Sequence, residues 1–227
     1  MKSLTMVELA RRMGATSVPD PAQLANIVEF ADGTVLKLFR KGSRIANLRC
    51  SRARRFARSA RRLRERGLCT VDVLDVLRVN ELGREGVIYR PLPGTDVRQC
   101  VRSVSVSLEV LGAFARLAAK LHRKGVYCRS LHLGNVILME GGSLGLVDVA
   151  DTSFGKTSLG VAKRVRNFRP ILRYPEQSLA IERYGPSRFI GSYLEESGLI
   201  RHAKAALVGS LRGKYALFAD LVPVPGG

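Results

Sequence analysis

Short apolar runs separated by turn residues dominate the N-terminal part of the chain, and this is the pattern of β-strands. Asn26–Phe30 and Thr34–Arg40 are apolar runs on either side of Ala31-Asp32-Gly33. Asp-Gly between two such runs predicts a β-hairpin. Val71–Val79 and Gly86–Arg90 predict two further strands. The pattern therefore predicts a small sheet in the first part of the chain.

Helical spacing of apolar residues interrupts these strands at two places. Met6–Arg12 predicts a short helix near the N-terminus. Arg49–Arg66 predicts a longer helix, which we expect to end at Gly67. Pro91-Leu92-Pro93-Gly94 then breaks all periodicity and indicates a linker.

Beyond the linker the spacing becomes mainly helical. Leu108–Lys124 predicts a helix that ends at Gly125. Val136–Met139 and Leu144–Val147 predict two short strands joined by a turn at Gly141-Gly142. The rest of the chain, to about Tyr215, is helical in pattern and basic. The apolar face of the first of these helices consists of Leu111, Phe114, Ala115, Ala118 and Leu121.

These elements predict an α+β protein with two small lobes. We expect a β-rich N-lobe in residues 1–90, with one Arg-rich helix, and a mainly helical C-lobe in residues 91–220 that carries a loop rich in polar residues. We expect residues 221–227, which are rich in Pro and Gly, to form a flexible tail. A chain of 227 residues, 46% of them apolar, is long enough to bury a core in each lobe.

A net charge of +19, from 38 Lys and Arg against 19 Asp and Glu, changes the expected partners. Such a field favours anionic ligands, whether phosphorylated sugars, an acidic lipid surface or nucleic acid. Residues 40–66 contain twelve basic residues and one acid. This run is either a solvated helix face or a contact with an anionic surface. A second basic run, Lys156–Arg173, is either a solvated segment or a guide for an anionic substrate.

Cysteine usage and hydropathy bear on the compartment. Cys50, Cys69, Cys100 and Cys128 show neither C-x-x-C spacing nor an accompanying His cluster, which argues against zinc and against a disulfide framework. We expect free, mostly buried thiols in a reducing cytoplasm. Residues 1–14 lack the apolar stretch of a signal peptide, and we find no apolar window long enough to span a membrane.

One stretch carries the candidate chemistry. Ser130 and Asn135 stand five residues apart in a loop, and Asp148 follows after a short hairpin, at the end of an apolar strand. A hairpin can present a loop Asn and a strand-end Asp on the same side. Their amide and carboxylate oxygens can together hold Mg²⁺ against the phosphates of ATP.

This pattern resembles the catalytic loop of kinases, H-R-D-L-x-x-x-N, followed by the metal-binding Asp. Lys37, within Val35–Phe39, is similar to the kinase strand lysine that contacts the α- and β-phosphates. The combination, with Tyr89–Gly94 and Arg129–Asn135, resembles the lipopolysaccharide core kinase and toluene-tolerance-type proteins of Gram-negative bacteria. The resemblance covers roughly residues 25–205.

The resemblance implies a small, trimmed protein-kinase-like fold, ATP and Mg²⁺ as cofactors, and a heptose or Kdo hydroxyl of the lipopolysaccharide inner core as acceptor. It implies that Lys37 binds ATP phosphates and that Asn135 and Asp148 bind the metal. Ser130, His132 and Asp148 are the candidate catalytic residues. The implied location is the cytoplasm, with peripheral contact at the inner face of the inner membrane.

Three features depart from the family pattern. Ser130 replaces the catalytic-loop Asp, and an ordinary serine hydroxyl is not a general base near neutral pH; His132 or Asp151 could assist. The predicted Arg-rich helix has only Glu65 as a partner for Lys37, one turn late. No Gly-rich phosphate loop is present.

These departures leave alternatives open. One is a nucleotide-binding pseudokinase with a regulatory or scaffold role, and another is a basic, RNA-linked kinase-like factor. The chain has no aromatic-rich motif or recognition helix for nucleic acid, which argues against RNA as a partner. For His132 a loop-holding role and a catalytic role both remain open, whereas His122, at the end of an apolar helical face, is expected to be a hydrogen-bonded core residue.

Overall fold

The computed structural model describes residues 2–40, 51–103 and 108–222. It confirms an α+β protein with mixed sheets. The chain forms two compact units. Unit 1 comprises Met1–Leu92 together with Asp148–Asp151, and unit 2 comprises Pro93–Val147 and Thr152–Gly227. The division between them falls within the Pro91–Gly94 segment, where periodicity stops.

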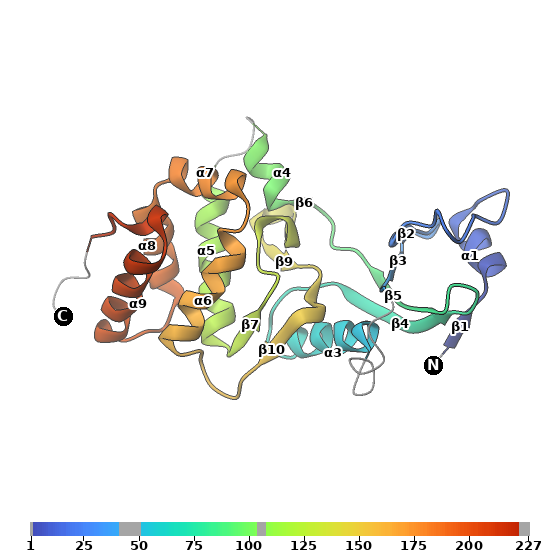
Figure 1. The fold of residues 1–227 in the computed structure, drawn as a ribbon, viewed down its shortest axis with the longest axis horizontal. Helices are drawn as coiled ribbons and strands as arrows, with labels where there is room; N and C mark the ends of the chain where they lie inside the picture. The colour runs from blue at the N-terminus through green and yellow to red at the C-terminus, as the bar shows by residue number, and fades with distance from the viewer. Residues whose placement is uncertain (1, 41–50, 104–107, 223–227) are drawn as a thin grey trace. The chain divides into compact units, whose positions relative to one another are not determined.

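Unit 1 contains a five-stranded sheet in the order β1-β4-β5-β3-β2 (Figure 1). Only the pair β1–β4 is parallel. The predicted hairpin and both later strands are confirmed, whereas β1 was not predicted. The strands are β1 (Lys2–Leu4), β2 (Ile27–Glu29), β3 (Val35–Leu38), β4 (Asp72–Val79) and β5 (Arg84–Arg90).

Local chemistry explains the β2–β3 hairpin. Gly33 has φ of 75°, a conformation that costs a glycine little. The carboxylate of Asp32 accepts hydrogen bonds from the backbone N–H of Thr34 at 2.9 Å and from its hydroxyl at 2.5 Å. These bonds hold the turn, and the ladder then pairs Ile27 with Lys37.

Helix α1 (Met6–Met13) packs on one face of this sheet. Its first turn is fixed by a capping box between Thr5 and Glu8. Because side chains alternate along a strand, one side of the sheet contributes Leu36 and Leu38 to this core. The cluster also includes Leu4, Met6, Leu9, Val28, Phe30, Leu77, Val79 and Ile88.

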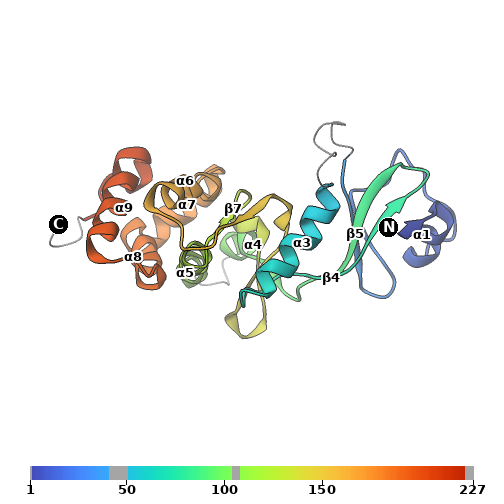
Figure 2. The same ribbon diagram turned by 90° about the horizontal axis from the view of Figure 1, so that it is seen from below.

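Helix α3 (Arg52–Arg64) lies against the other face (Figure 2). Its Phe56 ring lies 5.8 Å from that of Tyr89 on β5 and 5.9 Å from that of Phe39. The helix is capped by Ser51, and Gly67 follows it at a positive φ, as the sequence predicted. The predicted start, at residues 49 and 50, lies outside the described residues. The exposed residues of α3 are all arginines, namely Arg52, Arg54, Arg55, Arg58, Arg61 and Arg64.

Unit 2 contains two small antiparallel sheets, with strand orders β6-β8-β9 and β10-β7. The predicted strands β8 and β9 and their Gly141-Gly142 turn are confirmed. The sequence did not predict the other three. The strands are β6 (Thr95–Asp96), β7 (Val126–Cys128), β8 (Val136–Leu138), β9 (Leu144–Leu146) and β10 (Thr152–Phe154).

The rest of unit 2 is mainly helical, as predicted for residues from 108 onward, whereas the helix over Val97–Arg102 was not predicted. The central helix of this unit, α5, buries the apolar face that the sequence predicted. The ring of Phe114 on α5 stacks on that of Phe189 in α8, with 6.5 Å between the ring centres. The helices are α4 (Val97–Arg102), α5 (Glu109–Arg123), α6 (Val161–Ile171), α7 (Pro175–Tyr184), α8 (Pro186–Glu196) and α9 (Arg201–Lys214).

Two further sequence expectations can be compared with the described residues. Cys69, Cys100 and Cys128 form no disulfide within the described residues, and the last two are buried. Cys50 lies outside the described ranges. None of the helices in the described part of the chain is both long and apolar enough to cross a bilayer.

Candidate functional site

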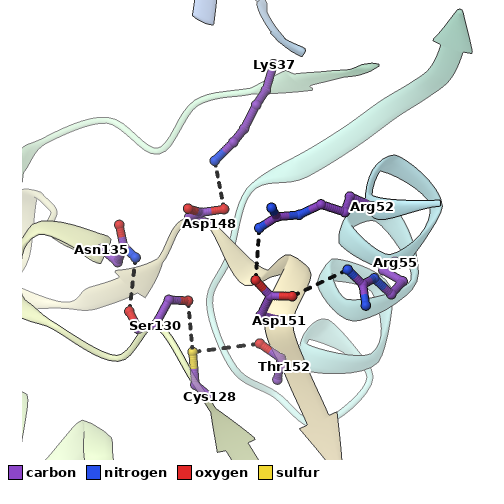
Figure 3. Close-up of polar contacts among 9 residues, drawn as sticks. All are labelled: Lys37, Arg52, Arg55, Cys128, Ser130, Asn135, Asp148, Asp151 and Thr152. Atoms are coloured by element: carbon purple, nitrogen blue, oxygen red, sulfur yellow. Dashed lines mark hydrogen bonds and ion pairs between the residues drawn. The ribbon is translucent and has the colours of Figure 1, made fainter. Parts of the chain in front are cut away.

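Lys37 and Asp148 form an ion pair within unit 1. The Nζ atom of Lys37 lies 2.7 Å from Oδ1 of Asp148 (Figure 3). Strand alternation turns Lys37 to the α3 face of the sheet, where its ammonium lies 5.7 Å from the centre of the Phe56 ring. The lysine side chain is 18% exposed and the aspartate 39%. The sequence expected both residues at one phosphate site, and the structure brings them into contact.

Asp148 has an unusual backbone conformation. Its φ is +52°, and within the described residues it is the one non-glycine residue with a positive φ. The left-handed region costs such a residue about 1 kcal/mol, and outliers of this kind concentrate at functional sites. The next residues, Val149 and Ala150, are buried, and this burial holds the strained turn in place.

The turn after Asp148 is held by helix α3. Arg52 donates to Oδ2 of Asp151 at 2.9 Å, and Arg55 lies 3.5 Å from Oδ1 (Figure 3). Strand β10 follows Asp151 directly, so this carboxylate does not cap a helix. The carboxylate instead fixes the turn against the arginines of α3.

Helix α3 therefore supplies cations to Asp151 rather than an acid to Lys37. Its Glu65 lies 3.5 Å from Nε of Arg61. Lys37 takes its carboxylate from Asp148 instead. The departure noted in the sequence, a missing acidic partner on this helix, is present in the structure.

Within unit 2, the loop of residues 129–135 is braced by its own asparagine. The Nδ2 of Asn135 donates to the carbonyl of Ser130 at 3.0 Å, and its backbone N–H donates to the carbonyl of His132 at 2.9 Å. Figure 3 shows Oδ1 of Asn135 turned away from Ser130. The Asn135 carbonyl accepts from the N–H of Val147 at 2.9 Å, and Asp148 is the next residue in the chain.

The hydroxyl of Ser130 lies beside sulfur. Its Oγ is 3.8 Å from Sγ of Cys128, and the Thr152 hydroxyl donates to the same sulfur at 3.7 Å (Figure 3). Sulfur is a weak partner and does not activate a serine. The structure thus gives Ser130 a position in the loop and no strong base among these contacts.

His132 is held on two sides. Its Nδ1 faces the guanidinium of Arg98 at 3.3 Å, and its ring meets that of Tyr174 edge-on at 5.4 Å. Since a guanidinium can only donate, Nδ1 accepts, and the proton of the neutral ring is on Nε2. These contacts favour the loop-holding role for His132 over the catalytic one.

A buried polar network holds the backbone just before this loop, at Cys128. His122 is fully buried, with Nδ1 2.7 Å from the Tyr193 hydroxyl and Nε2 3.0 Å from Oδ1 of Asn167. Asn167 in turn donates to the carbonyl of Cys128 at 2.7 Å. Burial is the main cause that lowers the pKa of His122 to about 4. The prediction of a hydrogen-bonded core histidine is confirmed.

Burial and negative charge also act on Tyr89, whose ring packs against that of Phe56. The pKa of Tyr89 is raised to about 12, mainly by desolvation and then by the carboxylates of Asp148 and Glu29. Tyr89 is therefore neutral and packs as an apolar ring against α3. Within the residues that the structure describes, no three His, Cys, Asp or Glu side chains gather as metal ligands.

Sequence reasoning missed Arg52, Arg55 and Arg98. The first two lie in a basic run that the sequence assigned to a solvated helix face or to contact with an anionic surface, and no local pattern links them to Asp151, about a hundred residues later. Arg98 is in helix α4, which was not predicted. Only the tertiary fold brings these side chains to their partners.

No protein-family model matches the chain, and a search of curated proteins also finds no match.

Proposed function

We propose that the chain is a Mg²⁺- and ATP-dependent phosphotransferase of the lipopolysaccharide kinase type, with a small two-lobed kinase-like fold. The acceptor is a hydroxyl of a heptose or Kdo sugar of the inner core. One observation carries the proposal: the 2.7 Å contact between Lys37 Nζ and Asp148 Oδ1. A strand lysine and a strand-end aspartate at one point are the two charged groups that phosphoryl transfer requires on the nucleotide side.

The order of the elements supports the kinase-like reading. The lysine strand β3 is followed by α3, which packs on the same face of the sheet as Lys37. Further along the chain come the loop with Asn135, the β8–β9 hairpin and then Asp148. This is the order in which kinases carry the corresponding parts.

Each residue then has a role in binding. Lys37 would neutralise the α- and β-phosphates of ATP. The carboxylate of Asp148 and Oδ1 of Asn135 are hard oxygen donors of the kind that Mg²⁺ prefers, and Mg²⁺ uses one or two carboxylates together with phosphates and water. The metal, when bound, supplies charge neutralisation on the transferring phosphate. The bond from Asn135 Nδ2 to Ser130 leaves the amide oxygen for this purpose.

The acceptor side depends on Ser130 and His132. The Ser130 hydroxyl can hydrogen-bond an acceptor hydroxyl and orient it, and His132, held by Arg98 and Tyr174, keeps the loop in shape. Phosphoryl transfer through a loose transition state needs positioning and charge neutralisation more than a strong base. Turnover without a catalytic-loop Asp is therefore expected to be slow rather than absent.

One observation favours a second candidate, a nucleotide-binding pseudokinase. Helix α3 gives Lys37 no carboxylate, and its Arg52 and Arg55 bind Asp151 instead. An acidic partner for the strand lysine is a requirement of active protein kinases. In this alternative the chain binds nucleotide for a regulatory or scaffold role and transfers no phosphate.

A cytoplasmic location, with contact at the inner face of the inner membrane, belongs to the same proposal. The exposed face of α3 consists of arginines, and clustered arginines are attracted to anionic headgroups. That face would bring the protein to the surface where its glycolipid acceptor is found.

The experiment that separates the two candidates is a phosphotransfer assay. Purified protein is incubated with γ-labelled ATP, Mg²⁺ and a heptose- or Kdo-containing core oligosaccharide, and the label on the sugar is followed by mass spectrometry. We expect slow transfer that is lost in Asp148→Ala. Nucleotide binding without any transfer to sugar would refute the transferase and support the pseudokinase.

A further inference from the structure

Unit 2 contains a groove that takes no part in the proposed nucleotide site. It has a volume of about 1170 Å³ and is formed by the β7–β10 ribbon, the segment that follows it, helix α6 and Tyr215. Lys37, Asn135 and Asp148 are not among its lining residues. Its positive side chains are Arg129, Lys163, Arg166, Arg169 and Arg173.

These five side chains are exposed, and within the described ranges none of them lies within ion-pair distance of a carboxylate. Other arginines of the same unit do have acidic partners. Arg123 lies 2.5 Å from Glu196, Arg188 lies 2.5 Å from Glu109, and Arg116 lies 3.9 Å from Glu195. The positive charge of the groove is therefore not neutralised by the described residues.

Helical spacing explains why the charges line up. Lys163, Arg166 and Arg169 recur every three residues on α6, and Arg173 follows just after its end. The opposite face is buried through Val165, Phe168 and Ile171, and it also contains Arg164, whose guanidinium bonds inside the core. At about 1.5 Å of rise per residue, the stripe from Lys163 to Arg169 extends over about 9 Å.

The floor of the groove is fixed and partly aromatic. Tyr127, Phe154 and Tyr215 are half-buried, and the Tyr215 hydroxyl donates to the carbonyl of Val165 at 3.0 Å. At one end of the ribbon Gly155 N–H donates to the Gly125 carbonyl at 2.7 Å. A fixed floor lowers the ordering cost of binding.

From this geometry we propose that the groove is a binding site for a ligand that carries several phosphates. A single phosphate would meet only part of a charged stripe about 9 Å long, whereas a chain or cluster of phosphates spans it. Exposed arginines bind phosphate oxygens in bidentate geometry and keep their charge at any physiological pH. The source is either a soluble oligophosphate or a lipid headgroup with more than one phosphate. This site is independent of the proposed nucleotide site.

The test uses inorganic tripolyphosphate, with inorganic phosphate for comparison, in calorimetry on the full chain. Divalent cations are removed with EDTA, and the titration is repeated in Lys37→Ala, so that a failure of the nucleotide site does not affect the result. The test variant is Arg166→Gln with Arg169→Gln. The matched control, Arg116→Gln with Arg188→Gln, removes the same charge from exposed helical positions of the same unit. Far-UV circular dichroism checks that both variants are folded.

We expect saturable tripolyphosphate binding that is at least about tenfold tighter than phosphate binding, since several charge-assisted bonds form together. The groove variant should weaken it about tenfold or more, and the control less than about twofold. Equal weakening in both variants, or no saturable binding by the wild type, would overturn the proposal, because a general field of net charge would then explain any attraction.

A second arm identifies the source. The same variants are sedimented with phosphatidylcholine vesicles that contain cardiolipin, a lipid with two phosphates. Loss of vesicle binding in the groove variant alone assigns the site to lipid headgroups. Equal vesicle binding by both variants, with tripolyphosphate binding lost only in the groove variant, assigns it to a soluble oligophosphate.

Discussion

His122 gives the stability of unit 2 a defined dependence on pH. Its ring is fully buried between Tyr193 and Asn167 and lies near the guanidinium of Arg164, so that a proton on the second nitrogen would place a further charge in the core. The pKa of His122 is lowered from 6.5 to about 4, chiefly by burial. The unfolded chain therefore takes up this proton first as the pH falls.

The sign and size follow from linkage. The stabilisation is fully present above the unfolded pKa of 6.5 and is lost progressively as the pH falls through the folded pKa of about 4. Between pH 7.5 and pH 5 the two pKa values correspond to a loss of about 2 kcal/mol in the free energy of unfolding. Protonation of carboxylates also lowers the free energy of unfolding in acid, so the comparison requires a variant in which residue 122 does not titrate.

The comparison is with His122→Gln, which keeps a polar side chain but does not titrate. At pH 7.5 the variant is less stable, by about 2 kcal/mol, because buried hydrogen bonds are lost. The gap between wild type and variant should shrink by about 2 kcal/mol at pH 5. Urea unfolding measures this difference in the free energy of unfolding. It is followed by far-UV circular dichroism, because the chain has no Trp to serve as a fluorescence probe. A gap that is the same at both pH values would refute the buried, neutral histidine.

The remaining predictions concern two glycines and two arginines. Gly125→Ala should lower the free energy of unfolding in urea by at least about 2 kcal/mol, because φ is +71° and the added Cβ would lie 2.4 Å from a backbone oxygen. Gly33→Ala should lower it by only about 1 kcal/mol, because φ is +75° but nothing lies within 4 Å of the added Cβ. Equal losses in the two variants would contradict this reasoning. Replacing Arg52 and Arg55 by Gln should change stability by less than about 1 kcal/mol, because both are nearly half exposed. The same double variant should weaken Mg²⁺-ATP binding about tenfold in calorimetry, because the turn after Asp148 loses its anchor; unchanged affinity would show that the anchor is not needed.

Local sequence signals predicted the elements that local chemistry determines. The β2–β3 hairpin follows from Asp32-Gly33, and α3 ends near Gly67 as expected. By contrast, β1 consists of three residues and exists only because it pairs in parallel with β4, far along the chain. Strands β7 and β10 likewise form by pairing across more than twenty residues. Short strands of this kind carry no periodicity of their own.

In the candidate site, too, local spacing was predictable from the sequence and long-range contacts were not. The spacing of Ser130, Asn135 and Asp148 was visible in the sequence, but the partners of these residues were not. Lys37 and Asp148 are more than a hundred residues apart in the sequence and come into contact only in the folded unit. The contacts of Asp151 with Arg52 and Arg55 likewise form only on folding. The burial of Arg164 could not be predicted either, since arginine side chains are mostly exposed in proteins.

The central claim is that Lys37 and Asp148 form a nucleotide site, and calorimetric titration with ATP and Mg²⁺ tests it most directly. Wild type is compared with Lys37→Ala and Asp148→Ala. The control is Lys2→Ala, which breaks another ion pair of the same sheet, 2.7 Å from Asp75. We predict micromolar, Mg²⁺-dependent binding in wild type and control, and its loss in both site variants. No binding to the wild type at millimolar ATP would contradict the account.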